Sequence, residues 1–144
     1  MLAVDTNILV SAHRREVAEH DQALERIRAL AEGAAPWAIP WPCVYEFFSV
    51  VTNPRIWKSS ASSPAAAWAQ VRAWTGSPQL RVLGETEEFL EVLQSLLSRP
   101  RVRGAVVHDA RVAALWLAHG VEALLSRDRD FSLFPELNVE GPLG

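Results

Sequence analysis

The sequence predicts an α/β domain built on a mainly parallel sheet. Short apolar runs of strand length alternate along the chain with longer segments whose apolar residues recur at helical spacing. Parallel strands need a crossover between them, and helices supply it in right-handed units. The chain has 144 residues, and we expect one domain over residues 1–144 with no internal linker.

The first half of the chain is expected to contain two strands and three helices. An apolar run that ends in Asp5 is typical of a buried strand that opens into a turn. Gly33 follows the first helical pattern as a stop, and Ser63 with Pro64 supplies a cap and a first-turn proline for the third. The expected strands are residues 2–5 and 38–40, the expected helices are residues 16–32, 42–52 and 64–75, and the polar segment 55–63 is expected to be a mobile loop.

The second half continues the alternation. Thr86 is expected to cap a helix that presents Phe89 and four leucines on one face and ends before Pro100. Gly120 is expected to stop a later helix that Asp109 opens. The expected strands here are residues 80–83, 122–126 and 137–139, and the helices lie between residues 86 and 100 and over residues 110–119. The sheet should therefore have roughly five strands.

The composition is typical of a folded, soluble protein of the cytoplasm. Hydrophobic residues make up 49% of the chain and charged residues 22%, which is ordinary globular usage. The single cysteine, Cys43, lies in an apolar stretch and is expected to be a buried thiol in a reducing compartment. The sequence has neither a secretory signal pattern nor an apolar run long enough to span a bilayer, so we expect no membrane partner.

Several acidic residues lie where an open parallel sheet binds ligands, beyond the carboxyl ends of its strands. Asp5 ends the first strand, Asp128 follows the fourth, and Asp109 opens a helix. Glu46 is the one acid on an otherwise apolar helix, where an unpaired buried charge would need a partner or a metal. Each also has a structural reading, because Asp5 and Asp109 could be helix caps and Asp128 and Asp130 could be turn acids paired with arginines.

Converging carboxylates predict a site for divalent metal ions. Mg²⁺ and Mn²⁺ favour hard oxygen ligands, and bound metals can activate water for hydrolysis of a phosphodiester. The net charge of −3 and the pI of about 5.8 would argue against a nucleic-acid partner. Metals bound by the acids would offset that negative charge, so the charge balance does not exclude RNA.

Four blocks of sequence carry a resemblance to a known family over almost the whole chain. In order, they are LAVDTNILVSA, WPCVYEFFSVVTNP, HDARVAALWLAHG and ALLSRDRDFSLFP. In residues, order and approximate spacing they resemble the PIN-domain nucleases, and in particular the VapC-type toxins of bacterial toxin–antitoxin pairs.

The resemblance implies a fold, an activity and a set of site residues. The expected fold is a PIN-like three-layer α/β/α sandwich, and the expected activity is Mg²⁺- or Mn²⁺-dependent endoribonuclease cleavage of RNA. It also implies homodimerisation and inhibition by a cognate antitoxin protein. Thr6 and Asn7 resemble residues that shape the active-site turn, and Ser126 stands where the family tolerates Thr or Ser. The residues similar to the four catalytic, metal-binding acids and to a more variable fifth metal-binding acid are Asp5, Glu46, Asp109, Asp128 and Asp130.

Other classes fit less well. A phosphatase of the haloacid dehalogenase type would carry a second Asp where this chain has Asn7, and a signal receiver would need a strand-ending Lys, whereas the only lysine is Lys58. The serious alternative is a PIN-like module that binds RNA or protein without cleaving.

The tryptophans have structural and functional readings. Trp68, Trp74 and Trp116 are expected in the core because they lie at helical spacing, and Trp57 is considered for contact with RNA or a partner. A Trp-rich surface beside the acids would suit an antitoxin segment.

Overall fold

The computed structural model describes residues 1–127 and 131–141 and contains a fully parallel sheet of five strands. The strands are β1 (Leu2–Val4), β2 (Trp37–Pro40), β3 (Leu80–Leu83), β4 (Ala123–Leu125) and β5 (Val139–Glu140), and their order across the sheet is β3-β2-β1-β4-β5. All five strands lie at or within two residues of the predicted segments, so the predicted parallel sheet is confirmed. The first strand of the chain lies at the centre of the sheet, between β2 and β4.

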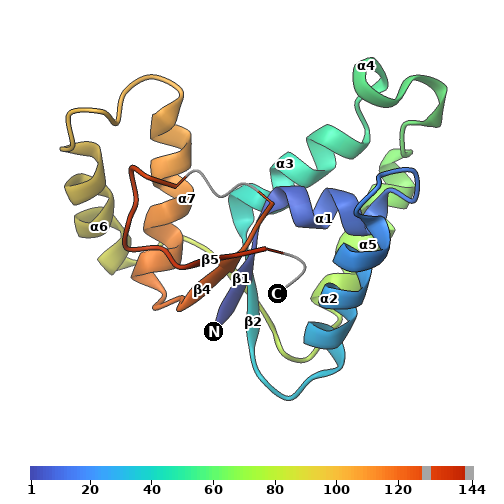
Figure 1. Cartoon of the computed structure of the whole chain (residues 1–144), viewed down its shortest axis with the longest axis horizontal. Helices are drawn as coiled ribbons and strands as arrows, with labels where there is room; N and C mark the ends of the chain where they lie inside the picture. The colour runs from blue at the N-terminus through green and yellow to red at the C-terminus, as the bar shows by residue number, and fades with distance from the viewer. Residues whose placement is uncertain (128–130, 142–144) are drawn as a thin grey trace.

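Helices cover both faces of the sheet and complete the three-layer sandwich (Figure 1). One layer contains α1 (Thr6–His13), α2 (His20–Glu32), α3 (Trp41–Val51) and α5 (Pro64–Thr75). The other contains α6 (Glu87–Leu97) and α7 (Val106–Ala118).

Successive residues of the strands belong to two separate hydrophobic clusters, one on each face of the sheet. Val4 and Leu125 pack with the helices of the first layer, whereas Ala3 and Leu124 pack with α6 and α7. This follows from the two-residue repeat of a strand, which sends successive side chains to opposite faces. No helix of the described ranges is long and apolar enough to cross a membrane.

The helices differ from the sequence-based expectation in four places. Residues 6–13 form α1, which was not predicted, and α2 begins at His20 rather than at Glu16. The segment expected to be a loop contains the short helix α4 (Pro54–Trp57) and a 3-10 turn, η1 (Lys58–Ser60). Helix α7 begins at Val106, so Asp109 lies within its first turn instead of opening it.

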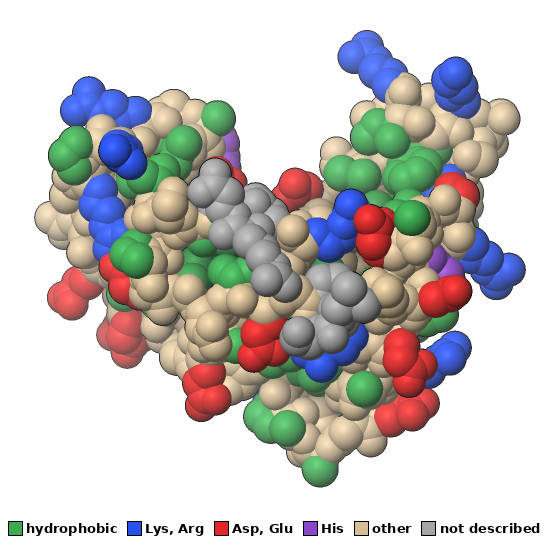
Figure 2. Space-filling model, in the orientation of Figure 1, with side chains coloured by type: hydrophobic (Ala, Val, Ile, Leu, Met, Phe, Trp, Pro, Cys, Tyr) green, Lys and Arg blue, Asp and Glu red, His purple; other side chains and the backbone are tan. Residues whose placement is uncertain are grey.

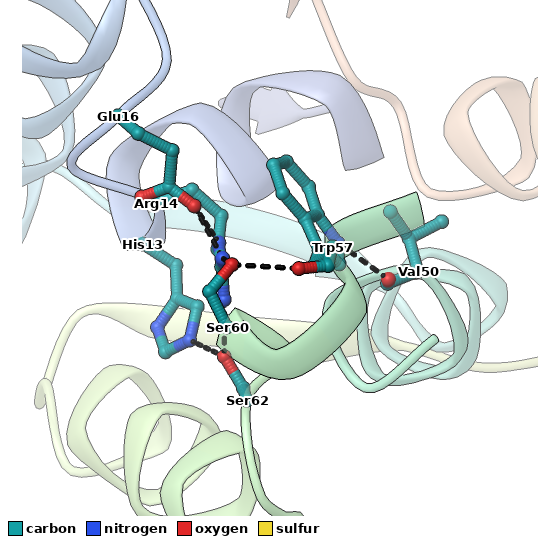
Figure 3. Close-up of polar contacts among 7 residues, drawn as sticks. All are labelled: His13, Arg14, Glu16, Val50, Trp57, Ser60 and Ser62. Atoms are coloured by element: carbon teal, nitrogen blue, oxygen red, sulfur yellow. Dashed lines mark hydrogen bonds and ion pairs between the residues drawn. The ribbon is translucent and has the colours of Figure 1, made fainter. Parts of the chain in front are cut away.

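Residues 54–60, here called the arm, continue from the end of α3 and project away from the sheet (Figure 1). The indole of Trp57 is turned back toward α3, and its Nε1–H donates a hydrogen bond of 2.8 Å to the carbonyl of Val50. The hydroxyl of Ser60 donates to the carbonyl of Trp57 at 2.7 Å (Figure 3). Trp57 therefore holds the arm together, and contact of its ring with RNA or a partner stays a prediction.

Arg14, just after the end of α1, clamps the arm to the body of the domain (Figure 3). Its side chain is buried, its guanidinium carbon lies 4.1 Å from the centre of the Trp57 ring, and its terminal nitrogens donate to the hydroxyls of Ser60 and Ser62 at 3.2 and 3.1 Å. Glu16 completes the cluster by accepting from Nε of Arg14 at 2.7 Å. A buried guanidinium with this many partners fixes the arm in one position.

Candidate active site

A cavity of about 590 Å³ opens at the carboxyl ends of β1 and β4. Three of the predicted acids reach it from different parts of the chain: Asp5 after β1, Glu46 on α3 and Asp109 on α7. Figure 2 shows the notch in this edge of the molecule, between the walls that α3 and α7 form. The lining residues are Asp5, Thr6, Asn7, Val10, Glu46, Val50, Val106, Asp109, Val112, Trp116, Arg127, Phe131, Ser132, Leu133 and Phe134.

Asp5 caps α1 and faces the cavity at the same time, so its two readings are compatible. Its Oδ1 accepts from the backbone N–H of Thr6 at 2.8 Å, and its Oδ2 accepts from the hydroxyl of Ser126 at 2.8 Å. The Sγ of Cys43 approaches Oδ1 at 3.9 Å. These contacts hold the carboxylate in one orientation at the end of the central strand.

Asn7 ties the ends of β1 and β4 together behind Asp5. Its amide nitrogen donates to the hydroxyl of Ser126 at 3.1 Å, and its amide oxygen accepts from the backbone N–H of Arg127 at 3.0 Å. Because Ser126 in turn donates to Asp5, the three side chains form a chain of hydrogen bonds across two neighbouring strands. Asn7 is thus placed to shape the turn that presents Asp5.

Glu46 is exposed, and the prediction that it carries a buried charge was wrong. Tyr45 beside it is also exposed, at 61%, whereas Val44 and Phe47 are the residues of this turn that pack into the core. The carboxylate of Glu46 still has a fixed neighbour, since its Oε2 accepts from the hydroxyl of Thr6 at 3.1 Å. Thr6 therefore links Glu46 to the Asp5 turn.

Asp109 lies in the first turn of α7 and is exposed to the cavity. Four backbone N–H groups at a helix N-terminus point out of the helix and favour a negative charge nearby. The expected role of Asp109 as an N-cap is excluded, because the cap position belongs to Ala105.

Arg127 is the one Lys or Arg among the described residues that line the cavity. Its guanidinium forms an ion pair with Glu19 at 3.2 Å and donates to the hydroxyl of Ser11 at 3.3 Å. Sequence reasoning noted Arg127 only as a partner for turn acids, because Glu19 lies more than a hundred residues away in the chain.

Cys43 lies behind the acids as a buried thiol, as predicted. Burial raises the pKa of the Cys43 thiol well above its ordinary value, and the carboxylates of Asp5 and Glu46 raise it further. The thiol therefore stays protonated and serves as a packing group with a weak S–H donor.

Asp5, Glu46 and Asp109 are three of the five acids predicted to bind metal, and their carboxylates are suited to a divalent ion. Within residues 1–127 and 131–141, no group of three or more His, Cys, Asp or Glu side chains lies close enough to hold a metal ion. The two remaining predicted acids, Asp128 and Asp130, lie outside the described residues. Carboxylates from three elements in one open cavity nonetheless match the hard oxygen ligands and retained waters of Mg²⁺ or Mn²⁺.

The tryptophans divide between the cavity, the core and the surface. Trp116 and Trp74 are buried as predicted, but Trp68 is 49% exposed, so its assignment to the core was wrong. Trp116 also lines the cavity, and its Nε1–H has no hydrogen-bond partner within the described part of the chain.

Comparison with known proteins gives consistent matches over nearly the full length. The family model described as "PIN domain" matches residues 2–137. Ribonuclease VapC43 of Mycobacterium tuberculosis is 34% identical over 99% of this chain and 96% of its own length. Ribonuclease VapC48 of the same organism is 29% identical over 96% of this chain and 94% of its own length.

Solved structures share the fold. VapC20 of Mycobacterium tuberculosis, described as a sarcin-ricin loop cleaving toxin, has a TM-score of 0.65 at 21% identity over 92% of this chain and 93% of its own. VapBC2 from Rickettsia felis, bound to a promoter DNA fragment, contains a chain with a TM-score of 0.66 at 17% identity, and the match covers 97% of each chain.

Proposed function

The chain belongs to the PIN-domain family, and from that premise we propose that it is a metal-dependent endoribonuclease, the toxin of a toxin–antitoxin pair that acts in the cytoplasm. The observation that carries the proposal is the convergence of Asp5, Glu46 and Asp109 on one cavity at the carboxyl ends of the central strands. The names of the relatives, ribonucleases at 29% and 34% identity, support the activity.

We assign metal binding to Asp5, Glu46 and Asp109, with Asp128 as the fourth acid and Asp130 as a more variable fifth. Asp128 directly follows Arg127, which lines the cavity, so its place in the sequence supports this assignment. When bound, Mg²⁺ or Mn²⁺ would supply Lewis-acid activation of water and stabilisation of the charge that develops on the phosphate.

The chain's own residues would position the reactants. Ser126 and the backbone of Thr6 hold the Asp5 carboxylate, and the Thr6 hydroxyl holds Glu46, so the acids keep their orientation without a ligand. Arg127 lines the cavity next to these acids, and its guanidinium could exchange its ion pair with Glu19 for a phosphate oxygen of the RNA backbone. No covalent nucleophile is needed in this reaction.

The direct test is cleavage of a structured RNA by purified protein in Mg²⁺, in Mn²⁺ and in EDTA. The variants Asp5→Asn and Asp109→Asn should lose at least about 100-fold in rate, because each removes a metal-binding charge in a site where the charges act together. Asp21→Asn is the matched control, since Asp21 is exposed on α2 and does not line the cavity. Equal activity of Asp5→Asn and Asp21→Asn would contradict the assignment.

Metal binding can be measured independently of cleavage. A ligand present at 100 times its Kd stabilises the folded state by about 2.7 kcal/mol, so Mg²⁺ or Mn²⁺ should raise the Tm of the wild type and of Asp21→Asn but not of Asp109→Asn.

The alternative function is a PIN-like module that binds RNA or protein without cleaving. Such a module would bind RNA with no metal-dependent rise in Tm and no cleavage.

An antitoxin segment is the proposed inhibitor, docked on the hydrophobic wall of the cleft over α3 and the arm (Figure 2). Ile56 on the arm is 51% exposed, and the exposed Trp68 ring contacts Phe48 at 6.1 Å between centroids. A basic residue of the segment could reach the acids and exclude the metal. An antitoxin that inhibits equally well after its basic residues are replaced would contradict this mode of inhibition.

We also propose that the protein is a homodimer that uses the start of α3. Trp41 and Tyr45, 39% and 61% exposed, stack on one another there with their ring planes 24° apart. Exposed aromatic pairs of this kind are typical of protein interfaces. Light scattering after size exclusion should give twice the monomer mass for the wild type and the monomer mass for a Trp41→Ser, Tyr45→Ser variant.

A further inference from the structure

The walls of the cleft end in two groups of basic side chains. The arm rim consists of Arg55 and Lys58, which lie on α4 and η1, and the loop rim consists of Arg101 and Arg103 in the connection between α6 and α7. Figure 2 shows Lys and Arg side chains at both tips above the notch, with acidic side chains at its foot and along the opposite edge of the molecule. Four of the 14 Lys and Arg residues of this acidic protein, whose net charge is −3, thus stand at the cleft mouth.

Each rim is joined directly to a wall of the cavity. Val50 lines the cavity at the end of α3, five residues before Arg55, and Val106 lines it at the start of α7, three residues after Arg103. The acids on α3 and α7 lie below these points. A strand that crosses the cleft from one wall to the other, with a phosphate at the acids, would therefore pass both rims.

The rim charges differ from the other arginines near the cleft because they are not neutralised. Arg99, Arg111 and Arg127 each form an ion pair with a glutamate. Among the ion pairs of the described ranges, none involves a rim residue, and all four rim side chains are exposed. Unpaired exposed cations are the groups that exchange small counterions for phosphate at little cost.

The arm rim is also rigidly presented. Trp57 and Arg14 fix the arm through the contacts described above, and Lys58 is the one described non-glycine residue with a positive φ, 54°. A strained backbone persists only where surrounding contacts hold it, and such residues gather at ligand-binding places. The arm thus presents Arg55 and Lys58 in a fixed position above the cleft.

We propose that the two rims bind the phosphates of one RNA strand on both sides of the cleavage point. This inference rests on the proposed function, since it takes RNA as the substrate. Contacts to phosphate position a strand without reading its bases, so the rims would set the register of the RNA in the cleft and not its sequence. Both rims would act at once, because the acids lie between them.

The test measures binding of a fluorescein-labelled single-stranded RNA of 20 nucleotides in EDTA, where cleavage does not interfere, from 50 to 200 mM salt. Two double variants remove one rim each, Arg55→Gln with Lys58→Gln and Arg101→Gln with Arg103→Gln, and a quadruple variant removes both. The matched control is Arg28→Gln with Arg72→Gln, which removes the same charge from exposed positions on α2 and α5 outside the cavity.

The expected result follows from counterion release. Each phosphate contact to a single strand contributes about 0.7 to the slope of log Kd against log salt, so losing one rim should lower the slope by about 1.4. Over this fourfold range of salt, wild-type affinity should then fall about 7-fold more than that of either rim variant, and about 50-fold more than that of the quadruple variant. The control should keep the wild-type slope, and a second RNA of unrelated sequence should give the same differences.

Two results would overturn the inference: rim variants that match the Arg28→Gln, Arg72→Gln control, or a loss of slope in only one of the two rim variants. Failure of the proposed nuclease function would give a different combination of cleavage and binding results. A protein that never cleaves but shows the expected slopes would retain the two-rim binding mode as an RNA-binding module. A protein that cleaves with rim variants indistinguishable from the control would be a nuclease that holds its substrate elsewhere.

Discussion

Replacing Arg14 by methionine should lower the free energy of unfolding by about 2 kcal/mol, because it removes the clamp on the arm. Methionine keeps the apolar stem and removes two charged hydrogen bonds, to Ser60 and Ser62, at roughly 1.5–3 kcal/mol each, and a cation–π contact at 4.1 Å from the Trp57 ring at about 1 kcal/mol. It also removes the ion pair with Glu16, which lies at the surface and adds little. Arg14 is only 6% exposed, so burying its charge costs several kcal/mol in the wild type. The methionine variant does not bear this cost, which offsets most of the loss. Both serine hydroxyls keep access to other partners.

Urea unfolding followed by far-UV circular dichroism measures the effect. Arg15→Met is the matched control, because the neighbouring Arg15 is exposed, and it should stay within about 0.5 kcal/mol of the wild type. A double-mutant cycle with Trp57→Leu should give a coupling of about 1 kcal/mol between the two side chains. A coupling indistinguishable from zero, or an Arg14→Met variant as stable as Arg15→Met, would refute the clamp.

Three further predictions concern single residues. Cys43 is 1% exposed and should react with iodoacetamide at least about 100-fold more slowly in the folded than in the urea-unfolded protein, whereas equal rates would show that its site opens readily. The hydrogen bond from Arg99 holds the pKa of Glu136 below its ordinary value of 4.5, so this stabilisation is present above about pH 4.5 and lost as the pH falls through the lowered pKa. Glu136→Gln should therefore lower the Tm at pH 7 but not at pH 3, and a pH-independent difference would argue against the pair. Gly120 has a φ of 67° and free space around its Cα, so Gly120→Ala should cost about 1 kcal/mol from backbone strain alone, measured by urea unfolding.

The strands were predictable because each is a short apolar run between turn residues, but α1 was not. Its sequence contains Ile8, Leu9 and Val10 in succession, which are as suitable for a strand as for a helix, and an eight-residue helix has little helical periodicity to read. Ile8 and Leu9 are fully buried, so packing against the sheet decides the conformation. Sequence order also gives no strand order, which is why the central place of β1 had to come from the structure.

The sequence predicted where the acidic side chains lie better than it predicted whether they are buried or exposed. Asp5, Glu46 and Asp109 line one cavity, yet Glu46 is exposed although its neighbours in the sequence are apolar. The reason is that α3 also exposes hydrophobic residues such as Tyr45, so apolar neighbours did not mark a buried face. The pairing of Arg127 with Glu19 depends on the tertiary fold and leaves no local pattern to read.

The central position of β1 also bears on the synthesis of the protein. Strand β1 pairs with β4, and the hydroxyl that orients Asp5 belongs to Ser126, which is synthesised 121 positions after Asp5. Such long-range parallel pairing forms late in folding, because the intervening chain must be closed before the contact is gained. A nascent chain that has not yet reached β4 therefore contains Asp5, Glu46 and Asp109 but not the cleft in which they lie together. The site assembles only once nearly the whole domain is present.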